Sequence, residues 1–245
     1  MNASIRKIVK NHLIPYDEYI FGFANLDGLL PEKFKGYSYG ISIGRRLDDK
    51  IIDAIINGPT LEYLFSYEAI NNKLQEVCDQ ITTDLKQAGV LAVPIPPTIH
   101  ISSDKFDQYL PTLRYEVSHK MVATRAGLGW IGKTDLFISK KFGARLRLSS
   151  ILIDHKIKPS AEPLEKSRCG KCKICVEKCP AQAANGQLWD ITTDRDTFFD
   201  AFKCREKCSE LARKHLNLDR RICGICISVC PVGQRSRSGN KTQNS

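Results

Sequence analysis

A run of four cysteines constrains this chain more than any other feature of its sequence. The run is Cys169-Gly-Lys-Cys172-Lys-Ile-Cys175-Val-Glu-Lys-Cys179-Pro180. Its spacing, C-x2-C-x2-C-x3-C-P, is typical of cysteines that bind a cubane iron–sulfur cluster. Three closely spaced thiolates can hold three irons of one cube, whereas the fourth, which precedes proline, reaches a different cluster. The run therefore predicts a second set of cysteines elsewhere in the chain.

A matching set lies downstream, at Cys223-Gly-Ile-Cys226-Ile-Ser-Val-Cys230-Pro231. Cys204 or Cys208 is available as its remaining member. The two sets together predict a small module, like a bacterial ferredoxin, that binds two [4Fe-4S] clusters. We therefore expect electrons to pass through this protein.

Zinc and disulfides are the alternatives for these cysteines. Structural zinc sites usually pair two C-x2-C knuckles, and neither consecutive x2 intervals nor a Cys-Pro ending is needed for a tetrahedral site. The chain begins Met1-Asn-Ala-Ser-Ile-Arg-Lys-Ile, which does not resemble a signal peptide with an apolar core. Ten cysteines without an export signal indicate a reducing compartment, and we expect a cytoplasmic protein whose cysteines bind metal.

The composition is that of an ordinary globular protein with a basic balance. Of its 245 residues, 42% are hydrophobic and 26% charged, and no apolar run is long enough for a membrane span. The formal charge of +10 favours anionic partners such as nucleic acid, an anionic cofactor or an acidic redox protein. Much of the excess flanks the cysteines, where clusters bound by thiolates carry negative charge. These basic residues are Lys166, Arg168, Lys171, Lys173 and Lys178.

Residue patterns before the cysteines predict a mixed α+β domain. We expect helices at Ala3–Leu13, Leu47–Ile56, Leu61–Ala88 and Tyr115–Ala126. Strands are expected at Tyr19–Ala24, Tyr37–Ile43 and Val90–Ile95, and a hairpin should join Leu136–Ser139 to Arg145–Asp154. Cys78 should be a buried small apolar residue. The predicted domains are residues 1–160 and 161–232, with a disordered basic tail at 233–245.

One segment matches the sequence pattern of a phosphate-binding loop, but its flanking secondary structure differs. Gly127-Leu-Gly-Trp-Ile-Gly132-Lys133-Thr134 fits the pattern G-x4-G-K-[ST]. That loop requires a strand before it and a helix after it, so that backbone N–H groups and the helix dipole meet the phosphates. Here a predicted helix precedes the segment and a predicted strand follows it. We therefore do not expect nucleotide hydrolysis.

The segment Ala123-Thr-Arg-Ala-Gly127-Leu-Gly-Trp130-Ile-Gly-Lys133, the strands after it and the double Cys-Pro module resemble the epoxyqueuosine reductase family. The resemblance covers roughly residues 115–232. Members are cobalamin-dependent iron–sulfur enzymes that reduce an epoxide on tRNA, and they are related to corrinoid reductive dehalogenases. The resemblance implies a nitroreductase-like N-terminal domain that holds cobalamin, followed by a ferredoxin-like domain that supplies electrons.

The same resemblance gives the glycine-rich segment a role in binding a corrinoid. The residues concerned are Gly127, Gly129, Trp130, Gly132 and Lys133. Glycines let the backbone approach a flat ring closely, Trp130 offers an apolar surface and an N–H donor, and Lys133 can meet a phosphate. The alternative is that the glycines only make a helix-to-strand turn over a buried tryptophan.

The resemblance also distributes the cysteines between the two clusters. One cluster would be held by Cys169, Cys172, Cys175 and Cys230. The other would be held by Cys179, Cys204, Cys223 and Cys226. Cys208 is surplus, but it lies four residues after Cys204 on a predicted helix, so the two share a face and could exchange roles.

The sequence departs from the family at several points. No V-D-S-G-P-like segment supplies the family's proton-donating aspartate, and the aligned stretch is Leu110–Glu116. The catalytic residue is therefore unknown, and the candidate acids are Tyr115, Glu116, His119 and His100. A D-x-H-x-x-G segment is also missing, so cobalamin should bind base-off without a histidine from that motif. Only fifteen residues follow Cys230, so the helical-repeat domain that grips tRNA in long members is not expected.

These observations lead to one expected function and two alternatives. We expect an oxidoreductase that relays single electrons through two clusters to a cobalamin-type cofactor, or less plausibly a flavin, for an unidentified substrate. A ferredoxin or flavodoxin would be the low-potential electron donor. The first alternative is an electron-transfer protein with no substrate chemistry of its own. The second is an RNA-binding module, with tRNA as partner, in which the clusters are structural.

Overall fold

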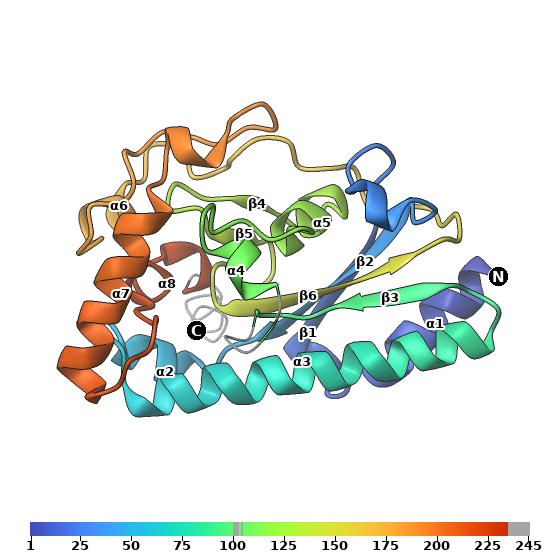
Figure 1. Cartoon of the computed structure of the whole chain (residues 1–245), viewed down its shortest axis with the longest axis horizontal. Helices are drawn as coiled ribbons and strands as arrows, with labels where there is room; N and C mark the ends of the chain where they lie inside the picture. The colour runs from blue at the N-terminus through green and yellow to red at the C-terminus, as the bar shows by residue number, and fades with distance from the viewer. Residues whose placement is uncertain (100–102, 104, 235–245) are drawn as a thin grey trace, which may run out of the picture. The chain divides into compact units, whose positions relative to one another are not determined.

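The computed structural model describes residues 1–99, 103 and 105–234, and they form two compact units (Figure 1). The first unit comprises residues 1–46, 68–128 and 147–165. The second comprises residues 47–67, 129–146 and the described residues from 166 to 234. The sequence predicts contiguous domains that meet near residue 160, whereas two segments from before residue 160 group with the cysteines. From residue 235 the predicted tail lies outside the described residues.

A four-stranded sheet forms the centre of the first unit. Its order is β1 (Tyr19–Asn25), β2 (Tyr39–Arg46), β6 (Leu146–Ile153) and β3 (Ala92–Ile95). β1 and β2 are antiparallel, with Tyr19 opposite Arg45. β3 and β6 are also antiparallel, with Ala92 opposite Ile153. The three strands predicted before residue 96 are thus confirmed.

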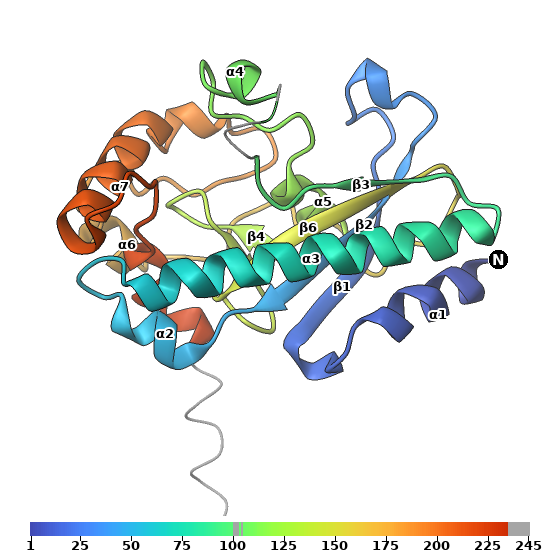
Figure 2. The ribbon, with the colours of Figure 1, turned by 60° about the horizontal axis from the view of Figure 1, so that its bottom comes forward.

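Helices cover both faces of this sheet (Figure 2). α1 (Asn2–His12) and α3 (Leu61–Gln87) lie on one face, and α5 (His119–Arg125) packs on the other. The alternation of side chains along each strand decides which residues meet which helix. On β1, Phe23 points to the α1 and α3 side, whereas Ala24 contacts the cluster around α5. On β6, Ile151 and Ile153 face one way and Leu152 the other.

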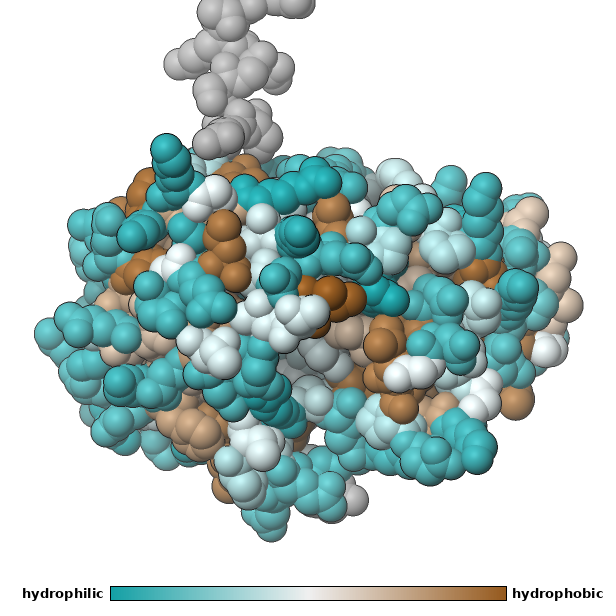
Figure 3. Space-filling view, turned by 90° about the horizontal axis from the view of Figure 1, so that it is seen from above, coloured by the Kyte–Doolittle hydropathy of each residue, from teal (hydrophilic) through white to brown (hydrophobic). Residues whose placement is uncertain are grey.

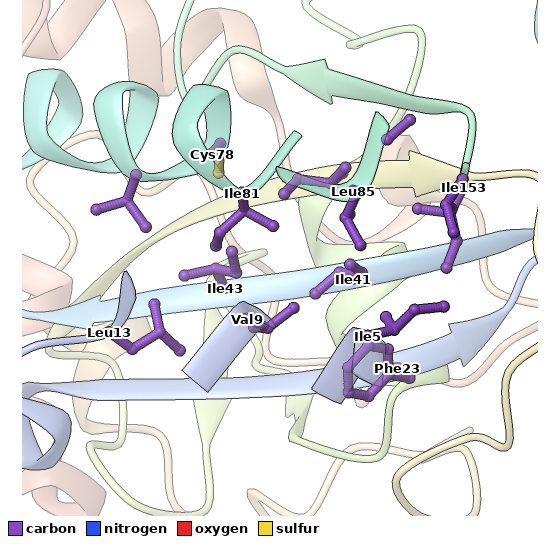
Figure 4. Close-up of a cluster of buried hydrophobic side chains, with 14 of the residues drawn as sticks. Ile5, Val9, Leu13, Phe23, Ile41, Ile43, Cys78, Ile81, Leu85 and Ile153 are labelled. Atoms are coloured by element: carbon purple, nitrogen blue, oxygen red, sulfur yellow. The ribbon is translucent and has the colours of Figure 1, made fainter. Parts of the chain in front are cut away.

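The larger core lies between the sheet and helices α1 and α3 (Figure 4). Ile5 and Val9 come from α1, Ile81 and Leu85 from α3, and all four are fully buried. Cys78 belongs to this core, where its thiol lies 3.3 Å from the Ser149 hydroxyl. Burial raises the pKa of Cys78 to about 12, so the thiol stays neutral. The prediction that Cys78 is a buried small residue is confirmed.

Local signals explain where the long helices begin and end. α3 stops before Gly89, which has φ +79°, and the N–H groups of Gly89 and Val90 donate to Lys86 and Leu85. This is a Schellman ending, which glycine adopts without strain. α5 begins at His119 and not at Tyr115, because the Ser118 hydroxyl caps it by accepting from the Met121 N–H. Between β3 and α5, the described residues include the short helix α4 (Phe106–Tyr109).

Short elements make up the second unit. They are α2 (Asp49–Ala54), β4 (Gly129–Ile131), β5 (Phe137–Ser139), α6 (Ile174–Glu177), α7 (Ala201–Leu216) and α8 (Ile225–Ser228). α8 packs against both α2 and α6. Asp48 caps α2 by accepting from two backbone N–H groups, and Asp200 caps α7 in the same way at Lys203. Apolar side chains on these elements, among them Ile52, Ile138 and Ile225, are buried.

The predicted hairpin between β5 and β6 is wrong. β5 pairs with β4, Trp130 being opposite Ile138, while β6 lies in the four-stranded sheet. The tight turn from Gly132 to Leu136 closes the β4–β5 pair, with the Gly132 N–H 2.7 Å from the Leu136 carbonyl. After β5 the chain bends back on itself, because Ser139 and Gly143 exchange backbone hydrogen bonds. Residues beyond Gly143 are therefore not aligned with β5.

The surface view in Figure 3 shows mainly hydrophilic side chains, with hydrophobic ones in small groups among them. Single exposed apolar side chains of this kind are normal on a folded protein. Among the described residues, no helix has the length and apolar character that a membrane crossing needs.

Candidate metal centre

The cysteines of the second unit lie on three helices and on the loops next to them. Cys175 is on α6, Cys204 and Cys208 are on α7, and Cys226 is on α8. Gly224, with φ +87°, lets the second loop lie against α2. A Cβ at Gly224 would come within 2.4 Å of Ile55 Cδ1. The positive φ and the close approach of Ile55 together favour glycine at this position of the C-G-I-C motif.

Three cysteines of the first motif lie near Cys230, although it belongs to the second motif. Burial raises the pKa of Cys230, and neighbouring Cys169 and Cys172 raise it further. Burial also raises the pKa of Cys175, as do the charges of Cys230, Cys169 and Cys172. Cys230 and Cys175 are thus within electrostatic range of each other and of Cys169 and Cys172. We call Cys169, Cys172, Cys175 and Cys230 the Cys230 group.

The remaining predicted ligands gather around Cys226. Burial raises the pKa of Cys226 well above its ordinary value, and the nearby thiolates raise it further. These thiolates are those of Cys223, Cys204, Cys175 and Cys179. We call Cys179, Cys204, Cys223 and Cys226 the Cys179 group. Because Cys175 also influences Cys226, the two groups are neighbours.

Cys208 is hydrogen-bonded to two members of the Cys179 group. Its single S–H is shared between the sulfurs of Cys204 and Cys223, and both contacts raise the pKa of Cys208. The same donation is the main cause that lowers the pKa of Cys223, to about 7. Cys208 therefore holds a position beside the group as a neutral donor, one helical turn from Cys204.

We expect Cys208→Ala to keep both clusters, whereas Cys204→Ala should lose the cluster of the Cys179 group. A cysteine that only donates a hydrogen bond is not needed to hold iron. Iron and acid-labile sulfide in anaerobically purified protein would measure this. If Cys204→Ala retains full iron and only the double variant of Cys204 and Cys208 loses it, Cys208 can replace Cys204 as a ligand.

The donor set of each group fits a [4Fe-4S] cluster, which is held by four cysteine thiolates. The four sulfurs of such a site surround a cube and do not meet at one point. Among residues 1–99, 103 and 105–234, no three His, Cys, Asp or Glu side chains converge as ligands of a single ion.

Close contacts within the protein account for the glycines predicted to approach a corrinoid. Gly127 has φ +70°, and a Cβ there would lie 2.6 Å from the Glu162 carbonyl oxygen. At Gly129 a Cβ would lie 2.1 Å from the Ile138 carbonyl oxygen, and at Gly132 it would lie 3.1 Å from Ile138 Cγ1. These contacts shape the turn after α5 and the β4–β5 pair. A contact of the glycines with a corrinoid stays a prediction.

Trp130 and Lys133 differ in whether their side-chain nitrogens have hydrogen-bond partners. Trp130 is 7% exposed, and its indole nitrogen is buried with no hydrogen-bond partner among the described residues. Lys133 is 3% exposed, and its ammonium donates to the Gly170 carbonyl oxygen at 2.8 Å. Lys133 thus contacts the first cysteine loop. Gly132, Lys133 and Thr134 lie in a hairpin turn that follows helix α5, so the phosphate-loop setting is absent, as predicted.

Two of the candidate acids are engaged within the first unit. The Nε2–H of His119 donates to the Pro96 carbonyl and its Nδ1 accepts from Ser150, each at 2.9 Å. Burial lowers the pKa of His119 to about 4, so the ring is neutral near pH 7. The Tyr115 hydroxyl donates to the same carbonyl, and burial raises its pKa to about 12.

The other two candidate acids give no stronger case. Glu116 is exposed and forms ion pairs with Lys33 and Lys105. Its carboxylate is therefore already paired within the first unit. His100 lies outside the described residues. The catalytic residue thus stays unassigned.

A cavity of about 750 Å³ opens in the first unit, away from all of these residues. It is lined by the start of α1, by Asn25 and Tyr39, and by residues 155–159. No cysteine or predicted corrinoid contact lines it. The cavity therefore does not bear on the metal centre.

Known proteins support the reading of the cysteine segment. Residues 168–233 match the model of a 4Fe-4S double cluster binding domain. The epoxyqueuosine reductase of Synechococcus sp. (strain CC9605) is 32% identical over 118 residues, which are 48% of this chain and 36% of that protein. Over about half of its length this chain is similar to epoxyqueuosine reductases. The predicted resemblance and the two [4Fe-4S] clusters are confirmed.

Solved structures share the fold of nearly the whole chain. An epoxyqueuosine reductase bound to an epoxyqueuosine-modified tRNA-Tyr stem loop has a TM-score of 0.59 at 15% identity, covering 95% of this chain and 66% of that one. A reductive dehalogenase, described as suggesting a mechanism for B12-dependent dehalogenation, has a TM-score of 0.65 at 14% identity, covering 91% and 32%. The mixed helix-and-sheet fold with a double-cluster domain is thus confirmed.

The matches also limit what can be transferred to this chain. It matches 36%, 40% and 28% of the lengths of the first three curated relatives. The chain therefore spans only part of the epoxyqueuosine reductases to which it is similar.

Proposed function

We propose that this chain is an iron–sulfur oxidoreductase that relays single electrons through two clusters to a cobalamin-type cofactor, for reduction of an unidentified substrate. The observation that carries the proposal is the interleaving of the two cysteine groups. Each group takes one member from the other motif, Cys230 in one case and Cys179 in the other. This crossing is the arrangement that places two cubes side by side, as a relay requires.

The chain's own residues would hold the clusters and control their surroundings. The Cys230 group would bind one cluster and the Cys179 group the other, and each cluster would supply a site for one electron. Backbone N–H groups of Val232 and Gly233 donate to Cys230, and that of Ile225 donates to Cys223. These donors stabilise the thiolate form of the ligands.

The proposal that this chain binds a corrinoid rests on its similarity to structures of epoxyqueuosine reductases and reductive dehalogenases. By that analogy the first unit would be nitroreductase-like, and a bound corrinoid would supply a cobalt centre able to reduce a difficult electrophile. Trp130 is the residue of the glycine-rich segment best suited to contact it. Its buried indole N–H is without a protein partner among the described residues and would be satisfied by an amide or phosphate acceptor.

Anaerobic binding of cobalamin tests this proposal directly. We expect one cobalt per chain after reconstitution, with corrin absorption bands that remain after gel filtration. Trp130→Phe keeps the apolar surface but removes the N–H, so it should weaken binding by about tenfold, the effect of one lost buried hydrogen bond. A spectrum with cluster absorption alone would contradict a corrinoid role.

The alternative function, an electron carrier without substrate chemistry, is supported by the hydrogen bonds of two candidate acids. His119 and Tyr115 both donate to the Pro96 carbonyl, so neither is poised toward a substrate. A chain with two clusters, no corrinoid and no acid would pass electrons to another enzyme. Absence of cobalt, together with electron transfer to an external acceptor, would favour this function.

Partners follow from the same chemistry. A low-potential donor such as a ferredoxin or flavodoxin would supply the electrons. A solved relative holds a tRNA stem loop, and the formal charge of +10 suits an anionic partner. Binding of tRNA that weakens steeply with salt would support tRNA as the substrate carrier.

A further inference from the structure

The turn between β4 and β5 meets the first cysteine loop through two consecutive side chains. The Lys133 ammonium donates to the Gly170 carbonyl oxygen, which lies between Cys169 and Cys172, at 2.8 Å. The Thr134 hydroxyl is hydrogen-bonded to the thiol of Cys175. Both side chains are almost completely buried, with exposures of 3% and 5%. The two residues that end the phosphate-loop pattern, Lys133 and Thr134, thus contact the first cysteine motif.

The geometry of the hairpin fixes both side chains in place. Gly129 lies so close to the Ile138 carbonyl that no larger residue fits. The Asp135 N–H donates to the Gly132 carbonyl at 3.0 Å, and Asp135 has φ +58°. The turn is therefore tight, and residues 133 and 134 at its tip cannot move far from the loop.

Both contacts favour a more negative cluster. A cluster held by four thiolates is an anion, and reduction adds one negative charge to it. A hydrogen bond to a ligand sulfur and a buried ammonium nearby each stabilise the reduced state more than the oxidised state. Hydrogen bonding to the sulfurs and net local charge are among the properties by which proteins set cluster potentials.

We propose that Lys133 and Thr134 act as positioning residues that raise the reduction potential of the cluster bound by the Cys230 group. The inference rests on the proposed cluster ligation. The step concerned adds one electron from a low-potential single-electron donor to the oxidised cluster, and no bond is made or broken. Without these residues the cluster accepts its electron less readily than it does in the unaltered protein.

The principal test replaces Thr134 with valine, which keeps the shape and loses the hydroxyl. Thr134→Ser, which keeps the donor, is the matched control. Redox titration followed by electron paramagnetic resonance should show two midpoint potentials. In Thr134→Val we expect the equilibrium constant for reduction of one cluster to fall about tenfold. For one electron this lowers the midpoint potential of that cluster by about 59 mV. The midpoint potential of the other cluster should be unchanged.

A second readout addresses the hydrogen bond itself. In the reduced unaltered protein, an exchangeable proton near a ligand sulfur should couple to the cluster spin. That coupling should disappear in Thr134→Val and remain in Thr134→Ser. Lys133→Met, with Lys133→Arg as its control, should lower the same midpoint because the buried charge is lost.

The outcomes separate this inference from the proposed function. Full iron and sulfide in Thr134→Val with both midpoints unchanged would overturn the tuning role and leave the clusters in place. Loss of a cluster in Thr134→Val but not in Thr134→Ser would assign the hydroxyl to holding the cluster and would also overturn the tuning role. Unaltered protein without iron and sulfide would overturn both proposals.

Discussion

Replacing Cys230 with alanine should remove the same cluster that is lost when Cys169 is replaced. Cys230 stands in the second motif, but its sulfur lies near Cys169 and Cys172 of the first. In the same way Cys179→Ala should match Cys226→Ala. Each single variant should hold about half of the iron and sulfide of the unaltered protein, because one of two four-iron clusters is lost. Alanine is preferred to serine, which can still bind iron.

Spectra of the surviving cluster decide between crossed and uncrossed ligands. The crossed arrangement predicts that the reduced spectra of Cys230→Ala and Cys169→Ala agree, and that both differ from Cys226→Ala. If Cys230→Ala instead resembles Cys226→Ala, each motif holds its own cluster. Cys78→Ala is the matched control, since Cys78 is buried in the first unit and should leave the iron content unchanged.

Loss of the Arg145 side chain should destabilise the second unit more than other charge removals. Arg145 is 1% exposed and pairs with Asp49 at 3.1 Å and Asp53 at 2.7 Å. It also donates to the Ser228 carbonyl, which connects α2 and α8. Arg145→Met leaves two carboxylates without this partner. We expect a loss of about 2–3 kcal/mol, less than for a fully buried pair because Asp53 is partly exposed.

Guanidinium denaturation of anaerobic, cluster-loaded protein would measure this loss. Arg213→Met is the matched control, since Arg213 pairs with Asp219 on the surface, where both side chains are more than half exposed. Its denaturation midpoint should not move. Equal midpoints for Arg145→Met and Arg213→Met would show that the buried network does not hold α2 to α8.

Much of the fold follows from signals that are local in sequence. Apolar periodicity and the Gly89 ending locate α3, and β-branched runs locate β1 and β2, because these depend on residues a few positions apart. The strand partners of β5 and β6 do not follow in this way. Strand pairing depends on turn geometry and on burial far along the chain, such as that of Arg145 against Asp49 and Asp53.

The candidate site likewise contains features that local sequence predicts and features that depend on distant contacts. Cysteine spacing predicts the clusters because each loop is a local structure. The contacts of Lys133 with Gly170 and of Thr134 with Cys175 join residues about 40 positions apart, so no local pattern reveals them. The one available signal was the polar pair Lys-Thr next to a Gly-rich turn, which resembles a phosphate loop. Likewise, the grouping of residues 47–67 with the cysteines depends on the contact of Ile55 with Gly224.

Iron, acid-labile sulfide and zinc, measured together in protein purified without air, test the central claim most directly. Ligation by the Cys230 and Cys179 groups predicts two [4Fe-4S] clusters per chain, with equal amounts of iron and sulfide and no zinc. Zinc in place of iron, with no acid-labile sulfide, would contradict the assignment of both groups and the electron relay built on them.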